Sequence, residues 1–180
     1  MHDPIPIPFA ATADSRPALL VSACLLGAPV RYDGTAKPLP EGTQASLAHQ
    51  WQLIAVCPER LGGLPTPRPA AEILEGDGRS VLAGQAQVCD AQGGCHTAAF
   101  VQGAHLALAL AQRCGARHAL LKAHSPSCGS GRIHDGQFGG TLRPGDGVST
   151  ALLREAGITV FSEQDLQHGG LPGLAEALPS

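Results

Sequence analysis

The chain has 180 residues, of which 43% are hydrophobic and only 3% aromatic, and its formal net charge at pH 7 is −3. This apolar content is enough for one domain with its own core and excludes a wholly disordered chain. The scarcity of aromatic side chains and the lack of a basic surplus argue against nucleic acid as a partner, because base stacking and phosphate neutralisation require them.

The first residues predict no targeting or membrane segment. Residues 1–16 are rich in proline and lack the basic stretch that precedes the apolar core of a signal peptide, so they are expected to form a mobile arm. The longest apolar stretch, Ala18 to Val30, is too short and too interrupted to cross a bilayer. We therefore expect a cytoplasmic protein.

Short apolar runs alternate with helical segments along the rest of the chain. Strands are predicted at residues 18–23, 51–56, 118–123 and 158–161. Helices are predicted at residues 41–50, 97–113 and 148–156, and a small hairpin within residues 71–90. The stretches rich in glycine and proline predict loops over residues 61–69 and 125–147.

Alternation of strands and helices is typical of a parallel sheet with helices on its faces. The predicted fold is therefore α/β, with a single Rossmann-like domain over residues 17–165, a mainly parallel sheet flanked by helices, and a C-terminal tail over residues 166–180.

Three of the six cysteines follow predicted strands. Cys24 comes directly after the first strand, Cys57 directly after the second, and Cys128 shortly after the third. The carboxyl ends of parallel strands lie along one edge of a sheet, and ligands bind in the crevice outside that edge. Three thiolates in one crevice predict a centre for zinc, copper(I) or an iron–sulfur cluster, with one coordination position left open by the protein.

The residues alone leave several functions open. Zinc on the same three cysteines with a bound water would make a hydrolase, and a non-catalytic sulfur or metal carrier would use the same ligands. Cys89, Cys95 and His96 form a second cluster in a polar loop region, but it lacks a fourth zinc ligand at a usual spacing. Cys114 ends a predicted helix. No role is predicted for these three further cysteines.

Polar side chains near the three cysteines are candidates for catalysis and substrate binding. Glu59 lies two residues after Cys57 and is the natural general base for water, with Arg60 as its only evident ion-pair partner. Ser125 and Ser127 flank a proline before Cys128 and could orient a substrate. The weaker candidates for substrate binding are Asp33, Arg68 and Lys122.

Several unusual motifs occur in a fixed order. They are Ser22-Ala-Cys-Leu-Leu-Gly27 with Val30-Arg-Tyr-Asp-Gly34, then Cys57-Pro-Glu59 with Pro67-Arg-Pro69, and finally Ser125-Pro-Ser-Cys-Gly-Ser130. Together they resemble the bacterial thiouracil desulfurase family, long catalogued as a domain of unknown function. The resemblance runs from about residue 18 to residue 163, and the N-terminal arm, the stretch near residues 85–96 and the C-terminal tail depart from it.

The resemblance implies a [4Fe-4S] cluster held by Cys24, Cys57 and Cys128, with one iron not ligated by protein that binds the substrate sulfur. It implies Glu59 as the catalytic glutamate and a catalytic serine at Ser125 or Ser127. The expected reaction is a non-redox hydrolysis that converts 2-thiouracil, or a similar small thiolated pyrimidine, to uracil and hydrosulfide.

Overall fold

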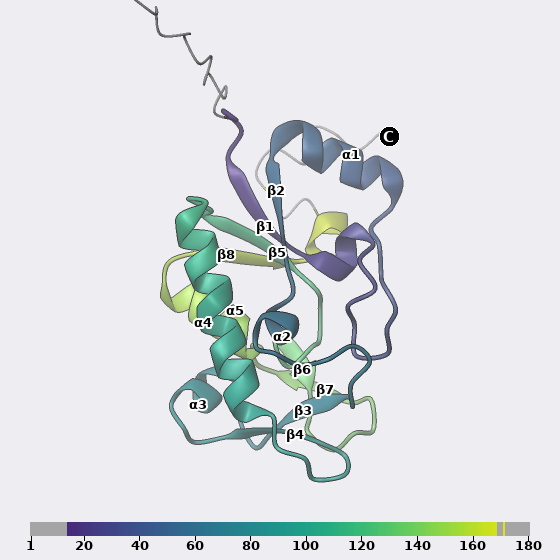
Figure 1. The fold of residues 1–180 in the computed structure, drawn as a ribbon, viewed down its shortest axis with the longest axis vertical. Helices are drawn as coiled ribbons and strands as arrows, with labels where there is room; N and C mark the ends of the chain where they lie inside the picture. The colour runs from purple at the N-terminus through teal and green to yellow at the C-terminus, as the bar shows by residue number, and fades with distance from the viewer. Residues whose placement is uncertain (1–13, 169–170, 172–180) are drawn as a thin grey trace, which may run out of the picture.

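A four-stranded parallel sheet forms the centre of the computed structural model, which describes residues 14–168 and residue 171 (Figure 1). Its strands, in the spatial order β2-β1-β5-β8, are β1 (Ala18–Ser22), β2 (Gln52–Val56), β5 (His118–Leu121) and β8 (Thr159–Ser162). All three neighbouring pairs are parallel. The predicted α/β class, the parallel sheet and its four strands are confirmed.

Helices cover both faces of this sheet (Figure 1). Alternate residues of a strand point to opposite faces, so Leu20 packs with the helices α4 (Thr97–Arg113) and α5 (Val148–Glu155). Leu19 packs on the other face with α1 (Glu41–Gln50) and the short 3₁₀ helices η1 (Ala23–Leu26) and η2 (Asp165–His168). Within the described residues, no helix is both long and apolar enough to cross a membrane.

The predicted arm and tail fall largely on the undescribed ends of the chain. Residues 1–13 and 172–180 lie outside the described residues, and so do residues 169–170. The folded region continues past the predicted boundary at residue 165, because Leu166 and Leu171 are buried in the apolar cluster that contains Leu19.

A second layer of short elements lies beyond the carboxyl edge of the sheet (Figure 1). It contains two antiparallel pairs and a short helix: β3 (Ala71–Leu74) with β4 (Gln87–Asp90), β6 (Arg132–His134) with β7 (Leu142–Pro144), and α3 (Gly78–Leu82). The hairpin predicted within residues 71–90 is confirmed, with α3 inside it.

Two predictions for this layer are wrong. The stretch predicted as a loop over residues 125–147 contains β6 and β7, and Cys89 lies in β4 rather than in a polar loop. Strands of three or four residues flanked by glycine carry too little apolar periodicity to be recognised. They are held by tertiary burial, since Ile133 of β6 and Val88 of β4 share one core cluster with Phe100 of α4.

Two glycines allow a very close contact between α2 (Pro58–Leu61) and α4. A Cβ atom added to Gly103 would lie 2.0 Å from the carbonyl oxygen of Pro58, and one added to Gly62 would lie 2.0 Å from the carbonyl oxygen of Ala99. Both obstacles are backbone atoms, which cannot rotate away. The contact therefore fixes α2 on the N-terminal half of α4, and with it the adjoining Cys57.

Gly103→Ala should destabilise the fold although alanine is the better helix former. Alanine in a helix interior is favoured over glycine by about 1 kcal/mol, but overpacking against a backbone costs about 1–3 kcal/mol. The matched control is Gly42→Ala in α1, where an added Cβ meets nothing within 4 Å and the free energy of unfolding should rise slightly. Urea denaturation of both variants measures this, and equal effects of the two substitutions would contradict the packing argument.

Candidate functional site

A cavity of about 910 Å³ opens at the carboxyl edge of the sheet, where β1 and β5 lie side by side. The chain leaves β1 toward β2 on one side and leaves β5 toward β8 on the other, so this is the point at which the strand order reverses. The two strand ends are also linked directly, because the backbone N–H of Lys122 donates to Oγ of Ser22 over 2.9 Å. The topology therefore creates the crevice that the sequence predicts.

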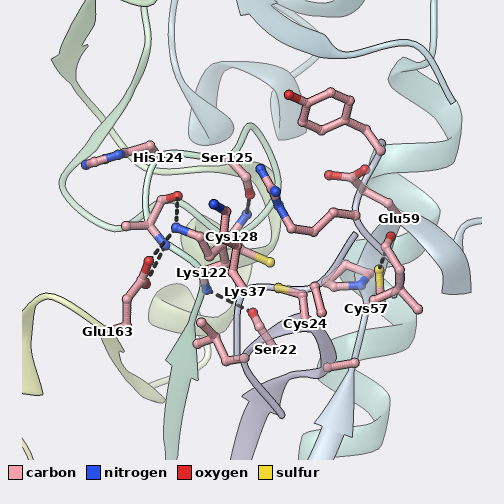
Figure 2. A pocket seen from close by; sticks show the side chains of 18 of the residues that line it. Ser22, Cys24, Lys37, Cys57, Glu59, Lys122, His124, Ser125, Cys128 and Glu163 are labelled. Carbon is pink, nitrogen blue, oxygen red and sulfur yellow. Dashed lines mark hydrogen bonds and ion pairs between the residues drawn. The ribbon is translucent and has the colours of Figure 1, made fainter. Parts of the chain in front are cut away.

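The structure brings Cys24, Cys57 and Cys128 to the lining of this one cavity (Figure 2). Cys24 lies in η1 directly after β1, Cys57 occupies the N-cap position of α2 after β2, and Cys128 lies in the turn after β5. Cys57 follows Cys24 by 33 positions in the sequence, and Cys128 follows Cys57 by 71 positions, yet all three cysteines line the same cavity. In Figure 2 the sulfur atoms of Cys24 and Cys128 point toward one another.

The turn that carries Cys128 is anchored to the N-terminus of α5. The Oγ atoms of Ser127 and Ser149 lie 3.0 Å apart, and the hydroxyl of Thr150 donates to the carbonyl oxygen of Cys128 over 2.8 Å. Ser127 is only 1% exposed and is not part of the cavity lining. Ser125 does line the cavity, and its Oγ accepts a hydrogen bond of 2.7 Å from the N–H of Cys128. The two candidate serines therefore occupy different environments.

Burial raises the pKa of all three cavity thiols. It raises the pKa of Cys24 from 9.0 to about 11 and that of Cys128 to about 12, and it also raises the pKa of Cys57. A smaller cause in Cys24 and Cys128 is the negative charge that a neighbouring Cys57 thiolate would carry. Thiolates crowded together in this way are stabilised by a cation, so metal binding here releases protons.

The three cavity thiols are donors of the kind that soft metal centres use. Within the described part of the chain, no three His, Cys, Asp or Glu side chains are gathered closely enough to hold one metal ion. In an iron–sulfur cluster each cysteine ligates a different iron, so its thiolates stand farther apart, and soft thiolates are its ordinary ligands. The three thiols are therefore a donor set that fits an iron–sulfur cluster.

Glu59 is held by an arginine from a neighbouring loop. Both Nε and Nη2 of Arg68 lie 2.6 Å from Oε2 of Glu59, and Nη2 also donates to the carbonyl oxygen of Val30 over 3.0 Å. The two side chains are 5% and 15% exposed, and both line the cavity. Arg60, the partner favoured by its place in the sequence, instead donates to the carbonyl oxygen of Leu64. Arg68 thus orients the carboxylate and leaves Oε1 out of this contact.

Lys122 is oriented by a residue that the sequence did not single out. Its Nζ forms an ion pair with Oε1 of Glu163, while Oε2 of Glu163 accepts a hydrogen bond of 2.8 Å from the N–H of Ala123 (Figure 2). Glu163 follows β8 directly, so the strand-end argument that identified the cysteines could also have found it. The cavity lining also includes Lys37, which is labelled in Figure 2.

Asp33 does not belong to the cavity lining. Its Oδ1 accepts hydrogen bonds from the N–H and the hydroxyl of Thr35, at 3.1 and 2.6 Å, which closes a turn. These hydrogen bonds lower the pKa of Asp33. The neighbouring Arg31 and Tyr32 do line the cavity. In this structure Asp33 shapes the loop through its hydrogen bonds with Thr35.

Two histidines also line the cavity. The rings of His124 and His134 lie edge to face with centroids 6.4 Å apart, and both residues line the cavity. Burial lowers the pKa of His124, with a further contribution from nearby Lys122. Nδ1 of His134 is buried and has no hydrogen-bond partner among the described residues. Neither histidine was among the candidate site residues, since His124 follows β5 and His134 ends β6, a strand that the sequence pattern did not predict.

Comparisons with known proteins show which family this chain belongs to. Residues 19–165 match the family model described as 2-thiouracil desulfurase. A protein of Bacillus subtilis (strain 168), YbbK, is 42% identical over 148 residues, which cover 82% of this chain and 97% of that protein. The solved structure of a [4Fe-4S]-dependent thiouracil desulfidase, TudS, is 47% identical and matches with a TM-score of 0.76 over 90% of this chain and 97% of its own. The chain therefore belongs to the 2-thiouracil desulfurase family.

Proposed function

We propose that this protein is a [4Fe-4S]-dependent enzyme that hydrolyses the C=S bond of 2-thiouracil or a similar small thiolated pyrimidine, releasing uracil and hydrosulfide. The observation that carries the proposal is one cavity lined by three strand-end cysteines and by a carboxylate held in place by Arg68. The family match and the similarity to a [4Fe-4S]-dependent thiouracil desulfidase support the same activity.

Cys24, Cys57 and Cys128 would hold the cluster as thiolates. Three protein ligands leave one iron without a protein ligand, and when bound the cluster supplies a Lewis acid that takes up the substrate sulfur. The protein contributes a rigid support, because η1, the start of α2 and the turn anchored to α5 each fix one cysteine. The reaction needs no external electron donor, since water replaces sulfur at the same oxidation level of carbon.

Glu59 would act as the general base. Arg68 contacts only Oε2, so Oε1 can accept a proton from a water molecule in the cavity. That water then attacks the ring carbon that carries sulfur. The low exposure of the Arg68 and Glu59 pair keeps the carboxylate in one orientation, which is what efficient proton transfer requires.

The remaining polar groups of the cavity would orient the pyrimidine. Ser125 carries a hydroxyl whose oxygen already accepts from the backbone, so its proton is free to donate to a substrate atom. Lys122, held by Glu163, offers a further contact on the same wall. An oxo or thioxo group and ring nitrogens are the partners that such groups recognise.

Metal analysis combined with a turnover assay tests the proposal. Anaerobically purified and reconstituted protein should contain iron and sulfide in the ratio of a [4Fe-4S] cluster and should convert an excess of 2-thiouracil to uracil over many turnovers. Zinc without iron after reconstitution would favour the zinc hydrolase instead. Release of no more than one sulfide per chain would favour a sulfur carrier, and either result would overturn the proposal.

Ser125→Ala and Ser127→Ala should have clearly different effects. Ser125→Ala removes a cavity hydroxyl and should lower kcat by about tenfold or more while the fold persists, because a hydrogen bond to the transition state is lost. Ser127→Ala leaves the hydroxyl of Ser149 without its buried partner. It should lower the free energy of unfolding by about 1–3 kcal/mol, and with it the melting temperature. Kinetics and thermal melts of both variants measure the difference, and the reverse pattern would assign catalysis to Ser127.

A further inference from the structure

Cys89 and Cys95 form a cross-strand pair away from the cavity. The two residues are directly opposite each other in an antiparallel bridge. The N–H of Asp90 donates to the carbonyl oxygen of Gly94 over 2.9 Å. The N–H of His96 donates to the carbonyl oxygen of Val88 over 2.8 Å. These hydrogen bonds belong to the residues on either side of the cysteines, so the cysteines themselves occupy a non-hydrogen-bonded site.

Non-hydrogen-bonded sites are the narrow positions of an antiparallel ladder. The Cα atoms of such a pair lie about 4.5 Å apart, which falls within the range of about 4.4–6.8 Å found in disulfides. The turn between the two cysteines is held by Asp90, whose Oδ1 accepts from the N–H groups of Gln92 and Gly94 at 2.9 and 2.8 Å. The backbone is therefore already in place for a disulfide bond.

The two thiols differ in a way that suits stepwise oxidation. Cys95 is exposed, and hydrogen bonds from the hydroxyl and the N–H of Thr97 at the start of α4 lower its pKa. Cys89 is 7% exposed, and burial raises its pKa. An accessible thiol with a lowered pKa is the attacking group in thiol–disulfide exchange, and a shielded neighbour is the group that resolves the mixed disulfide.

We propose that Cys89 and Cys95 are a redox-active dithiol that is oxidised to an intramolecular disulfide by a low-molecular-weight disulfide such as glutathione disulfide. The Cys95 thiolate attacks one sulfur of the oxidant, forms a mixed disulfide and releases one thiol. The Cys89 thiol then loses its proton and attacks the sulfur of Cys95, which releases the second thiol. The cysteine pair loses two electrons and two protons, and the oxidant becomes two thiols.

This site is separate from the proposed cluster. Neither cysteine is part of the cavity lining, so the pair is apart from the three cysteines proposed to hold the cluster. The proposal therefore does not depend on the desulfurase activity. It concerns a site of oxidation in β4 and in the segment that leads into α4.

Peptide mass analysis can test the proposal in the intact protein. Trypsin cleaves after Arg79 and Arg113, so the peptide 80–113 contains Cys89 and Cys95 and no other cysteine. Anaerobically purified full-length protein is equilibrated with mixtures of reduced and oxidised glutathione, and free thiols are alkylated with iodoacetamide. As the fraction of oxidised glutathione rises, the peptide should change from a form with two carbamidomethyl groups to a form with none. The mass of this second form should be lower than that of the unmodified dithiol peptide by two hydrogens.

Single substitutions separate the two chemical steps. Cys89→Ser should accumulate glutathione on Cys95 because no resolving thiol remains, whereas Cys95→Ser should leave Cys89 largely as a free thiol. Cys114→Ser, in a neighbouring tryptic peptide, should leave the disulfide unchanged. Two alkylated cysteines in peptide 80–113 at every glutathione ratio would overturn the proposal. A glutathione adduct on Cys95 that never resolves in the wild-type protein would also overturn it.

Discussion

Glu59→Gln is expected to lower turnover by orders of magnitude while the proposed cluster is retained. Glutamine has nearly the shape of glutamate, and its carbonyl oxygen can still accept a hydrogen bond from Arg68, but it cannot take a proton from water. General-base catalysis contributes about 10²–10⁴-fold to a rate, so kcat for thiouracil should fall by that factor. Substrate binding and iron content should stay close to those of the wild type.

The control for this substitution is Glu155→Gln, which makes the same change on an exposed residue at the end of α5. Its kcat should equal that of the wild type. Iron and sulfide analysis of both variants distinguishes lost chemistry from a lost cluster. A Glu59→Gln enzyme that turns over at the wild-type rate would remove Glu59 from the role of base and leave its contact with Arg68 as a purely structural one.

Replacement of any one of Cys24, Cys57 and Cys128 by serine is expected to lower the iron content strongly and to abolish turnover. A serine hydroxyl is a harder and far less acidic donor than a thiol, so it replaces a thiolate poorly on iron. The loss should be similar at all three positions, because a cluster with an iron free of protein has no spare protein ligand. Iron and sulfide content, together with the visible absorption of anaerobic samples, measures the effect.

Cys114→Ser provides the matched control for these variants. Cys114 lies at the C-terminal end of α4, packed against the apolar core and away from the cavity lining. Its substitution should leave iron content and kcat unchanged. Loss of the cluster from Cys114→Ser, or a full complement of iron in any of the three cavity variants, would contradict the proposed ligand set.

Local patterns carried most of the information about the fold. Apolar runs at 18–23, 51–56, 118–123 and 158–161 identified the central strands, and alternation with helices identified the parallel sheet. Local patterns did not predict the strands β6 and β7, which have three residues each. This pair depends on the burial of Ile133 of β6 in a core built from distant segments. Such strands have no stability of their own, so their residues carry no distinct signal.

The sequence by itself determined that three cysteines follow parallel strands, and therefore that they share one edge of the sheet. Only the tertiary structure decided which side chains contact one another there. Glu59 forms its ion pair with Arg68 rather than with Arg60. Lys122 forms its ion pair with Glu163, which lies 41 residues later in the sequence. Cys89 lies opposite Cys95 in an antiparallel bridge. A strand or helix follows from the period of nearby residues, whereas such contacts depend on how loops and separate elements are placed by packing. That placement depends on contacts between elements, such as the approach of Gly62 to Ala99, that no local pattern reveals.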